Sequence, residues 1–422
     1  MPKQTAQQKK ALEDFFSALA ASGDFMAALA SGTLGDKELA QIQLAGQGAQ
    51  LALVPRDAKD FLRLLTHHPM VAPATLSTAV AHYKYQHKSI TNSHRQQKRS
   101  LAEALGLKKD PCSCKELQAQ GVHIIYCSQS DDTPFKCGTT LVDQGNEGLV
   151  KGCEPILAVP ADDTWYVVPP GASVIFLGAE GKVELVVLRH CCAAWPNLID
   201  YVNEVIAKAV EDCHNCCPNH GGTLVQYGWN AGPCHARIFG LECAECDRKI
   251  LGVFALSWNL LTAALPKEVI EPTLAAIAAA DLPVMASQGN VQDTRYQLQL
   301  PGGPLTFNTA ERAPAEGTIH TDKLFAPYAL NWVTQHEVKD GQVNPQLTGG
   351  NYVDVSLRVV VKCATDTIMT MCPKFKHGTT VSCPGVLRQG TAINFSTHIK
   401  VAYAKAAEKE GFDLKTFQGP VA

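Results

Sequence analysis

Three residues near the carboxyl-terminal end of the sequence have the types and the order of a facial metal triad. His320 and Asp322 are separated by one residue, and His377 follows after a long stretch. Two imidazoles and one carboxylate occupy one face of an octahedral ion and leave the other positions open, which suits Fe(II) that must bind a co-substrate and O₂. A closed structural zinc site would use four protein ligands, mostly thiolates. The alternative is that His320 and Asp322 form a surface turn and that His377 caps a strand end.

A positive charge follows the candidate triad. Arg388 lies shortly after His377. An arginine on a strand beside the metal is suited to hold the carboxylate of an acidic co-substrate through two charge-assisted hydrogen bonds. Lys400 and Arg358 are alternatives for this role.

The residues around these side chains are typical of a β-rich region. We expect three strands, at residues 352–361, 367–371 and 392–396. The first is rich in β-branched residues and follows Gly349-Gly350, the second leads to His377, and Ala364–Asp366 between them is typical of a turn. Metal ligands on facing strands of a small barrel would be held rigidly.

This layout resembles the double-stranded β-helix core of 2-oxoglutarate/Fe(II) oxygenases. The resemblance rests on His320-x-Asp322, Gly349-Gly350, the turn at Asp366, His377-Gly378-Thr379-Thr380 and Arg388. Within that superfamily it is most similar to the TET/JBP branch, which oxidises methylated or unmodified pyrimidine bases in DNA and has many members in fungi and some in algae. The resemblance covers roughly residues 290 to 403.

The resemblance implies an α+β protein with a double-stranded β-helix (jelly-roll) core buttressed by helices. His320, Asp322 and His377 would hold Fe(II), and Arg388 would anchor the distal carboxylate of 2-oxoglutarate. A methylated base, 5-methylcytosine first and N6-methyladenine as a variant, would be flipped out of double-stranded DNA into the pocket. Asn331 and Ser396 are assigned to cofactor binding. The candidates for base recognition are Asn331, Trp332, His336, Ser396 and His398, and each of them could equally be structural.

A cluster of cysteines and histidines between residues 213 and 246 is the second chemical signal. Cys217 and His220 form one knuckle, and Cys243 and Cys246 form another, with the spacing of a zinc ribbon. Cys213 with Cys216 is an equally good first pair. The alternative is a group of reduced, unligated thiols that pack as small apolar side chains.

The composition is that of an ordinary globular protein. The 422 residues are 46% hydrophobic and 18% charged, and the net charge of −3 provides no overall attraction for nucleic acid. Residues 82–109 are the most basic stretch and contain two tyrosines, which favours either a phosphate-contacting arm or a solvated helix face. The sequence lacks the apolar core of a signal peptide and any run long enough for a membrane span. We therefore expect an intracellular protein, in the nucleus if it acts on DNA.

Three segments follow from these patterns. They are a helical extension at residues 1–110, a mixed β/α region at 111–290 that contains the Cys/His-rich insert, and the catalytic core at 291–422. The favoured function is a dioxygenase that uses Fe(II) and 2-oxoglutarate to oxidise a methylated base in DNA. The alternatives are an oxygenase of this class that hydroxylates a protein or a small molecule, and a non-catalytic zinc-containing interaction protein on an oxygenase fold. The sequence indicates no oligomeric state.

Overall fold

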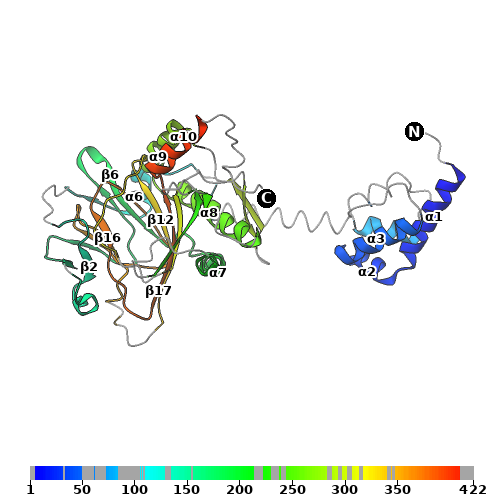
Figure 1. The fold of residues 1–422 in the computed structure, drawn as a ribbon, viewed down its shortest axis with the longest axis horizontal. Helices are drawn as coiled ribbons and strands as arrows, with labels where there is room; N and C mark the ends of the chain where they lie inside the picture. Colours follow the sequence, from blue (N-terminus) through cyan, green and yellow to red (C-terminus); the bar gives the residue numbers. More distant parts are fainter. Residues whose placement is uncertain are drawn as a thin grey trace. The chain divides into compact units, whose positions relative to one another are not determined.

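The chain forms two compact units in the computed structural model, residues 1–100 and residues 101–422 (Figure 1). The residues that the structure describes are 5–31, 34–49, 61, 73–83, 105, 107, 110–128, 135–153, 155–212, 222–229, 237–238, 244–282, 288–292, 297–301, 307–312, 317–339, 344 and 347–408. Within these ranges, no helix combines the length and the apolar character that a bilayer crossing requires.

The smaller unit is helical where it is described. Its helices are α1 (Ala6–Ala21), α2 (Gly23–Ser31) and α3 (Asp36–Gly48), and residues 74–83 are helical as well. α1 begins with a capping box, in which the Thr5 hydroxyl accepts a hydrogen bond from the Gln8 N–H. Apolar residues at helical spacing meet in one core that includes Leu12, Phe15, Phe16, Leu19, Phe25, Phe61 and Leu76. This unit therefore has a core of its own.

A nine-stranded sheet is the centre of the larger unit. Its strands, in spatial order, are β1 (His123–Tyr126), β5 (Val174–Leu177), β6 (Val183–Arg189), β15 (Thr367–Met371), β12 (Ala329–Val338), β17 (Val386–Asn394), β11 (Phe307–Arg312), β7 (Thr223–Trp229) and β8 (Arg237–Ile238). β1 and β5 are parallel, and the other neighbours are antiparallel. The four central strands of this sheet come from after residue 290, and strands from before residue 290 flank them on both sides.

A four-stranded sheet packs against the large one. Its order is β16 (His377–Thr379), β13 (Tyr352–Asp354), β14 (Val359–Val361) and β4 (Tyr166–Val168). Two further pairs are β2 (Thr140–Asp143) with β3 (Ile156–Val159), and β9 (Gln288–Gln292) with β10 (Gln297–Pro301). Short 3₁₀ turns occur at η1 (Glu147–Val150) and η2 (Ala179–Gly181).

The two sheets enclose an apolar interior. Phe176, Val187 and Met369 of the large sheet pack in one cluster with Tyr352 and Val359 of the small sheet. Successive side chains of a strand point to opposite faces, so every second residue of these strands faces this interior.

Helices cover the other face of the large sheet. They are α7 (Pro196–Asp212), α8 (Ala244–Ala264) and α9 (Lys267–Ala280), and the unit also contains α6 (Cys114–Ala119) and α10 (Thr397–Ala407) (Figure 1). Leu198 of α7 and Phe254 of α8 share a core with Trp332 and Ile368 of the sheet. Helices packed on a mixed sheet confirm the α+β class.

Two strands differ from the sequence prediction. Residues 352–361 form a hairpin of β13 and β14, not one strand. The Asp354 carboxylate accepts a hydrogen bond from the Leu357 N–H at 2.9 Å, and Arg358 turns the chain with φ of 55°. β17 begins at Val386, well before residue 392, and therefore includes Arg388. Gly390 lies within this strand and pairs with Val333, and a Cβ there would lie 2.7 Å from the Trp332 carbonyl oxygen of the neighbouring strand.

A substitution at Gly349 tests the close approach between the Gly349 segment and the Val381 segment. A Cβ at Gly349 would lie 2.0 Å from the Val381 carbonyl oxygen, and φ is +71°. Gly349→Ala should lower the free energy of unfolding by about 3 kcal/mol or more, since backbone strain and a clash with the main chain add. Gly181→Ala is the matched control, because Gly181 has φ of +74° and no atom within 4 Å of its Cβ position. Its loss should stay near 1–2 kcal/mol. Urea denaturation measures both, and equal losses would mean that the segment at Gly349 moves aside freely.

Candidate metal centre

Two reciprocal backbone hydrogen bonds place the two histidines side by side. The His320 N–H donates to the His377 carbonyl, and the His377 N–H donates to the His320 carbonyl, both at 2.9 Å. Side chains of directly opposite residues in such an antiparallel bridge lie on the same face. The ring centroids are 4.5 Å apart. Two predicted ligands that are far apart in the sequence therefore meet.

The Asp322 carboxylate completes the group. The backbone N–H of Asp322 donates to the Pro373 carbonyl at 2.8 Å, which holds the His320–Asp322 segment near the start of β16. Asp322 Oδ1 lies 3.9 Å from His320 Nε2, and Asp322 Oδ2 lies 3.5 Å from His377 Nε2. One ligand atom from each residue lies within 4.8 Å of the other two, so a single ion can contact all three.

The imidazoles are oriented for a metal ion. His320 Nδ1 lies 2.8 Å from the Thr318 carbonyl oxygen, and His377 Nδ1 lies 2.8 Å from the Phe375 carbonyl oxygen. A carbonyl only accepts, so we assign the proton of each ring to Nδ1 and the lone pair to Nε2. His377 Nε2 is buried and has no hydrogen-bond partner in the described structure. A bound ion would satisfy this atom, so the residues present fit a metal.

The charges of the group stabilise one another. Burial alone would raise the pKa of Asp322, but the close approach of His377 and the charges of both histidines lower this pKa below its usual value. Burial alone would lower the pKa of His377, but Asp322 and the Phe375 carbonyl raise this pKa above its usual value. The carboxylate is therefore ionised at neutral pH, as a metal ligand must be.

Two glycines permit the close packing behind the ligands. A Cβ at Gly378 would lie 2.9 Å from the Thr318 carbonyl oxygen and 2.8 Å from Leu141 Cδ1. A Cβ at Gly317 would lie 2.5 Å from the Thr379 backbone nitrogen. Larger side chains at these positions would push the His320 and His377 segments apart.

A buried acid lies beside the triad and was not expected from the sequence. Asp354 is the cross-strand partner of His377, is fully buried, and lies within 3.4 Å of the Tyr352 hydroxyl, which donates to it. Burial raises the pKa of Asp354 to about 7, although the Leu357 N–H and the charge of His377 oppose this shift. The signal in the sequence is an aspartate inside an otherwise apolar strand run.

Arg388 lies on the inner face of the large sheet. On β17, Ile393 and Thr391 face the helices, since Ile393 belongs to their core and the Thr391 hydroxyl is bonded to Ser257 of α8. The alternation of the strand therefore turns Ala392, Gly390 and Arg388 inward. Arg388 is buried, and a Cβ at Gly350 would lie 3.3 Å from its Cδ.

The other candidates for the arginine role lie elsewhere. Arg358 is in the β13–β14 turn, where its guanidinium donates to the Thr164 hydroxyl at 2.6 Å. Lys400 is on α10, with its ammonium 5.6 Å from the Phe325 ring centroid. Neither is on the inner face of the large sheet.

The residues predicted to contact the co-substrate or the base lie in different environments. Asn331 faces the interior, and its buried Nδ2 has no hydrogen-bond partner among the described residues. Trp332, the next residue, faces the helices, is fully buried, and donates its indole N–H to Asp366 at 3.2 Å, so it belongs to the core. Ser396 is half-buried and bridges Leu324, and His398 is exposed.

The predicted zinc ligands are not described by the structure. Cys213, Cys216, Cys217, His220 and Cys243 lie outside the described residues, and only the helical backbone of α8 is described at Cys246. The basic segment 82–109 also lies almost entirely outside the described ranges. Zinc binding and the phosphate-contacting arm therefore stay predictions.

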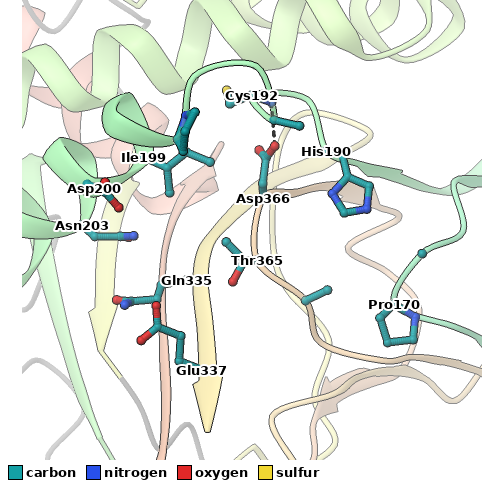
Figure 2. A pocket seen from close by; sticks show the side chains of 14 residues that line it. Pro170, His190, Cys192, Ile199, Asp200, Asn203, Gln335, Glu337, Thr365 and Asp366 are labelled. Carbon is teal, nitrogen blue, oxygen red and sulfur yellow. Dashed lines mark hydrogen bonds between the residues drawn. The ribbon is translucent and has the colours of Figure 1, made fainter. Parts of the chain in front are cut away.

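A cavity of about 510 Å³ lies on the outer side of the large sheet, away from the triad. Figure 2 shows Gln335 and Glu337 of β12 on the same side of it as Asp200 and Asn203 of α7. Its lining contains carboxylates and amides but no lysine or arginine, and none of the three candidate metal ligands lines it.

Comparison with known proteins gives structural similarity but no match in sequence. No protein-family model matches the chain, and no curated protein matches its sequence. Among solved structures, one similar chain is that of NgTET1 in complex with 5mC DNA, which is 12% identical with a TM-score of 0.39. The match covers 72% of this chain and 92% of that chain. Similarity at this level assigns no activity, and the interpretation of the site rests on its own residues.

Removal of a ligand should abolish tight metal binding. We expect His377→Ala and Asp322→Ala to weaken Mn(II) binding at least about 100-fold, since loss of even an outer partner of a metal ligand costs 10–100-fold. His123→Ala, at an exposed histidine on β1, is the control and should bind like the wild type. Isothermal titration calorimetry measures the affinities. Unchanged binding in both ligand variants would contradict the assigned site.

Asp354 should make the stability of the metal-free protein depend on pH. Its folded pKa of about 7 lies above its ordinary value of 3.8, so folding favours the protonated form. The stability from this group is complete below about pH 4 and is lost as the pH rises through about 7. Asp354→Asn should flatten this slope and raise Tm at neutral pH by a few degrees.

Thermal melts between pH 4 and pH 8 in the presence of a chelator check this expectation. Asp200→Asn, at an exposed carboxylate on α7, should retain the wild-type slope. A slope that persists in Asp354→Asn would assign the pH dependence to other groups.

Proposed function

We propose that this chain is an Fe(II)/2-oxoglutarate-dependent dioxygenase and that its two facing sheets form a double-stranded β-helix. The observation that carries the proposal is the convergence of His320, Asp322 and His377, whose ligand atoms lie within 4.8 Å of one another. Two imidazoles and one carboxylate are the donor set of non-haem Fe(II) oxygenases, and they leave coordination positions open. The intact ligand set favours catalysis over a non-catalytic interaction protein.

Iron would supply the redox chemistry, in which O₂ and 2-oxoglutarate are converted to succinate and carbon dioxide and one oxygen atom enters a C–H bond of the substrate. The protein provides the geometry. The Thr318 and Phe375 carbonyls hold the imidazoles in one orientation, and Asp322 is kept ionised by the histidines. Apolar side chains such as Met369 and Phe176 line the interior and exclude water from it.

Arg388 lies at a suitable distance from the triad to be a second anchor for the co-substrate. Gly350 lies beside Arg388 Cδ and donates its N–H to the Thr380 carbonyl at 3.0 Å. Thr380 is three residues from His377 along an extended segment, which corresponds to about 10 Å at ~3.3 Å per residue. A short dicarboxylate with its oxo-acid end at the triad would place its other carboxylate near Arg388.

For the substrate, we propose a methylated base in DNA, 5-methylcytosine first and N6-methyladenine as a variant. The motif layout around the triad suggests this class. The exposure of the ligands is compatible with it, because the His320 side chain is 50% exposed and that of His377 is 3% exposed. The site thus opens toward solvent at His320, where a base flipped out of a duplex could enter. The nucleus would be the location of such an activity.

Succinate formation tests both parts of this proposal. The iron-loaded protein receives 2-oxoglutarate with a duplex that contains 5-methylcytosine, a duplex that contains N6-methyladenine, an unmodified duplex, or no DNA. We expect the 5-methylcytosine duplex to stimulate turnover most and His320→Ala to lower the rate at least about 100-fold, while His123→Ala retains it. Equal turnover without DNA would keep the iron site but move the substrate to a protein or a small molecule. The absence of turnover in every arm would contradict the proposal.

A further inference from the structure

A β-bulge in β12 turns one histidine into the interior. The pairing of β12 with β17 shifts between Val333 and Gln335, so that Thr334 is an extra residue. Before the bulge, Asn331 and Val333 are the inward-facing positions. Without it, Gln335 would face inward and His336 outward. With it, Gln335 and Glu337 face the outer cavity beside α7 (Figure 2), and His336 faces inward.

The inward orientation makes His336 a neighbour of Arg388. The two residues are direct cross-strand partners on β12 and β17. Side chains of such partners point to the same face, with their Cβ atoms about 4.5–5.5 Å apart. The charge of Arg388 acts on the imidazole at this distance.

Buried polar atoms near this pair have no hydrogen-bond partner in the described structure. They are His336 Nε2 and Ser382 Oγ. Ser382 lies next to Arg388, since a Cβ at Gly350 would be 2.9 Å from Ser382 Oγ and 3.3 Å from Arg388 Cδ. An unsatisfied buried polar group costs about 1–3 kcal/mol, so two of them beside one buried arginine favour a bound polar ligand at this place.

The charges at this end of the interior favour an anion. Arg189 is buried and donates to the Lys362 carbonyl at 2.7 Å and to the Thr367 hydroxyl, and within the described residues it forms no ion pair. Burial, together with the charges of Arg388 and Arg189, lowers the pKa of His336 to about 4. His336 is therefore neutral at physiological pH and can donate one hydrogen bond through Nε2.

We propose that His336 is a specificity-determining residue that donates a hydrogen bond from Nε2 to the distal carboxylate of the dicarboxylate co-substrate, beside Arg388. The Ser382 hydroxyl is a further donor to the same carboxylate. This inference rests on the proposed function and assigns to His336 a positioning role, without contact to the metal. It makes recognition of the second carboxylate depend on the register of the bulge at Thr334.

The test compares two oxo acids. The full-length protein loaded with Mn(II) is titrated by calorimetry with 2-oxoglutarate and with pyruvate, which has the oxo-acid end but no distal carboxylate. His336→Leu should weaken 2-oxoglutarate binding about tenfold or more, the effect of one hydrogen bond to a charged group, and leave pyruvate binding unchanged. His336→Gln should recover part of the loss through its amide N–H. Glu337→Gln, one residue further and facing outward, should bind like the wild type.

The outcomes separate the two proposals. If the wild type binds 2-oxoglutarate and His336→Leu binds it equally well, the role of His336 is wrong and the proposed function stands. If His336→Leu loses affinity for pyruvate and 2-oxoglutarate to the same extent, His336 acts on the fold and not on the distal carboxylate. If the Mn(II)-loaded wild type binds neither oxo acid, the proposed function is overturned and this inference with it.

Discussion

The reciprocal backbone hydrogen bonds between His320 and His377 are the contact on which the candidate metal centre depends. They join two segments that are far apart in the sequence, so their formation requires the closure of a long loop, whose entropy the rest of the fold must offset. β16 places His377 at the edge of the small sheet, and Gly317 and Gly378 let the segment that contains His320 approach it. Main-chain hydrogen bonds hold the backbone at both histidines, and the Thr318 and Phe375 carbonyls orient the two imidazoles.

The interior between the sheets combines stabilising and destabilising features. Apolar side chains of both sheets pack together there, which favours folding. The same space contains the buried Asp354 carboxyl and several polar atoms that lack partners in the described structure. Natural proteins break the rules of polar satisfaction mainly at functional sites. Among them, His377 Nε2 belongs to the triad, and His336 Nε2 and Ser382 Oγ lie near Arg388, where a metal and an anionic ligand would satisfy them.

β12 contributes both to the core under the helices and to the interior between the sheets, because its side chains point to both faces of the large sheet. Its outward residues, such as Trp332, join the sheet to the helices through a buried core. Its inward residues, such as Asn331, face the interior. The bulge at Thr334 exchanges the faces beyond it, which turns His336 inward opposite Arg388. A single inserted residue in the pairing thus decides which side chains the interior contains.

The sequence by itself determined the chemistry of the candidate ligands and much of the local structure. The His-x-Asp spacing, the distal histidine and the β-branched runs are local patterns, and alternation with period 2 predicts strands whatever they pair with. Tertiary structure decided the rest. Asp354 breaks the predicted strand at 352–361 because its carboxylate closes a turn that only a hairpin allows. Gly390 permits close contact with the neighbouring strand, and β17 therefore continues through it and includes Arg388. Trp332 and His336 were indistinguishable as candidates in the sequence, and the strand register and the bulge separate them into core and interior. Side-chain direction in a sheet follows from pairing between distant segments, and one residue of shift reverses it, so no local pattern contains that information.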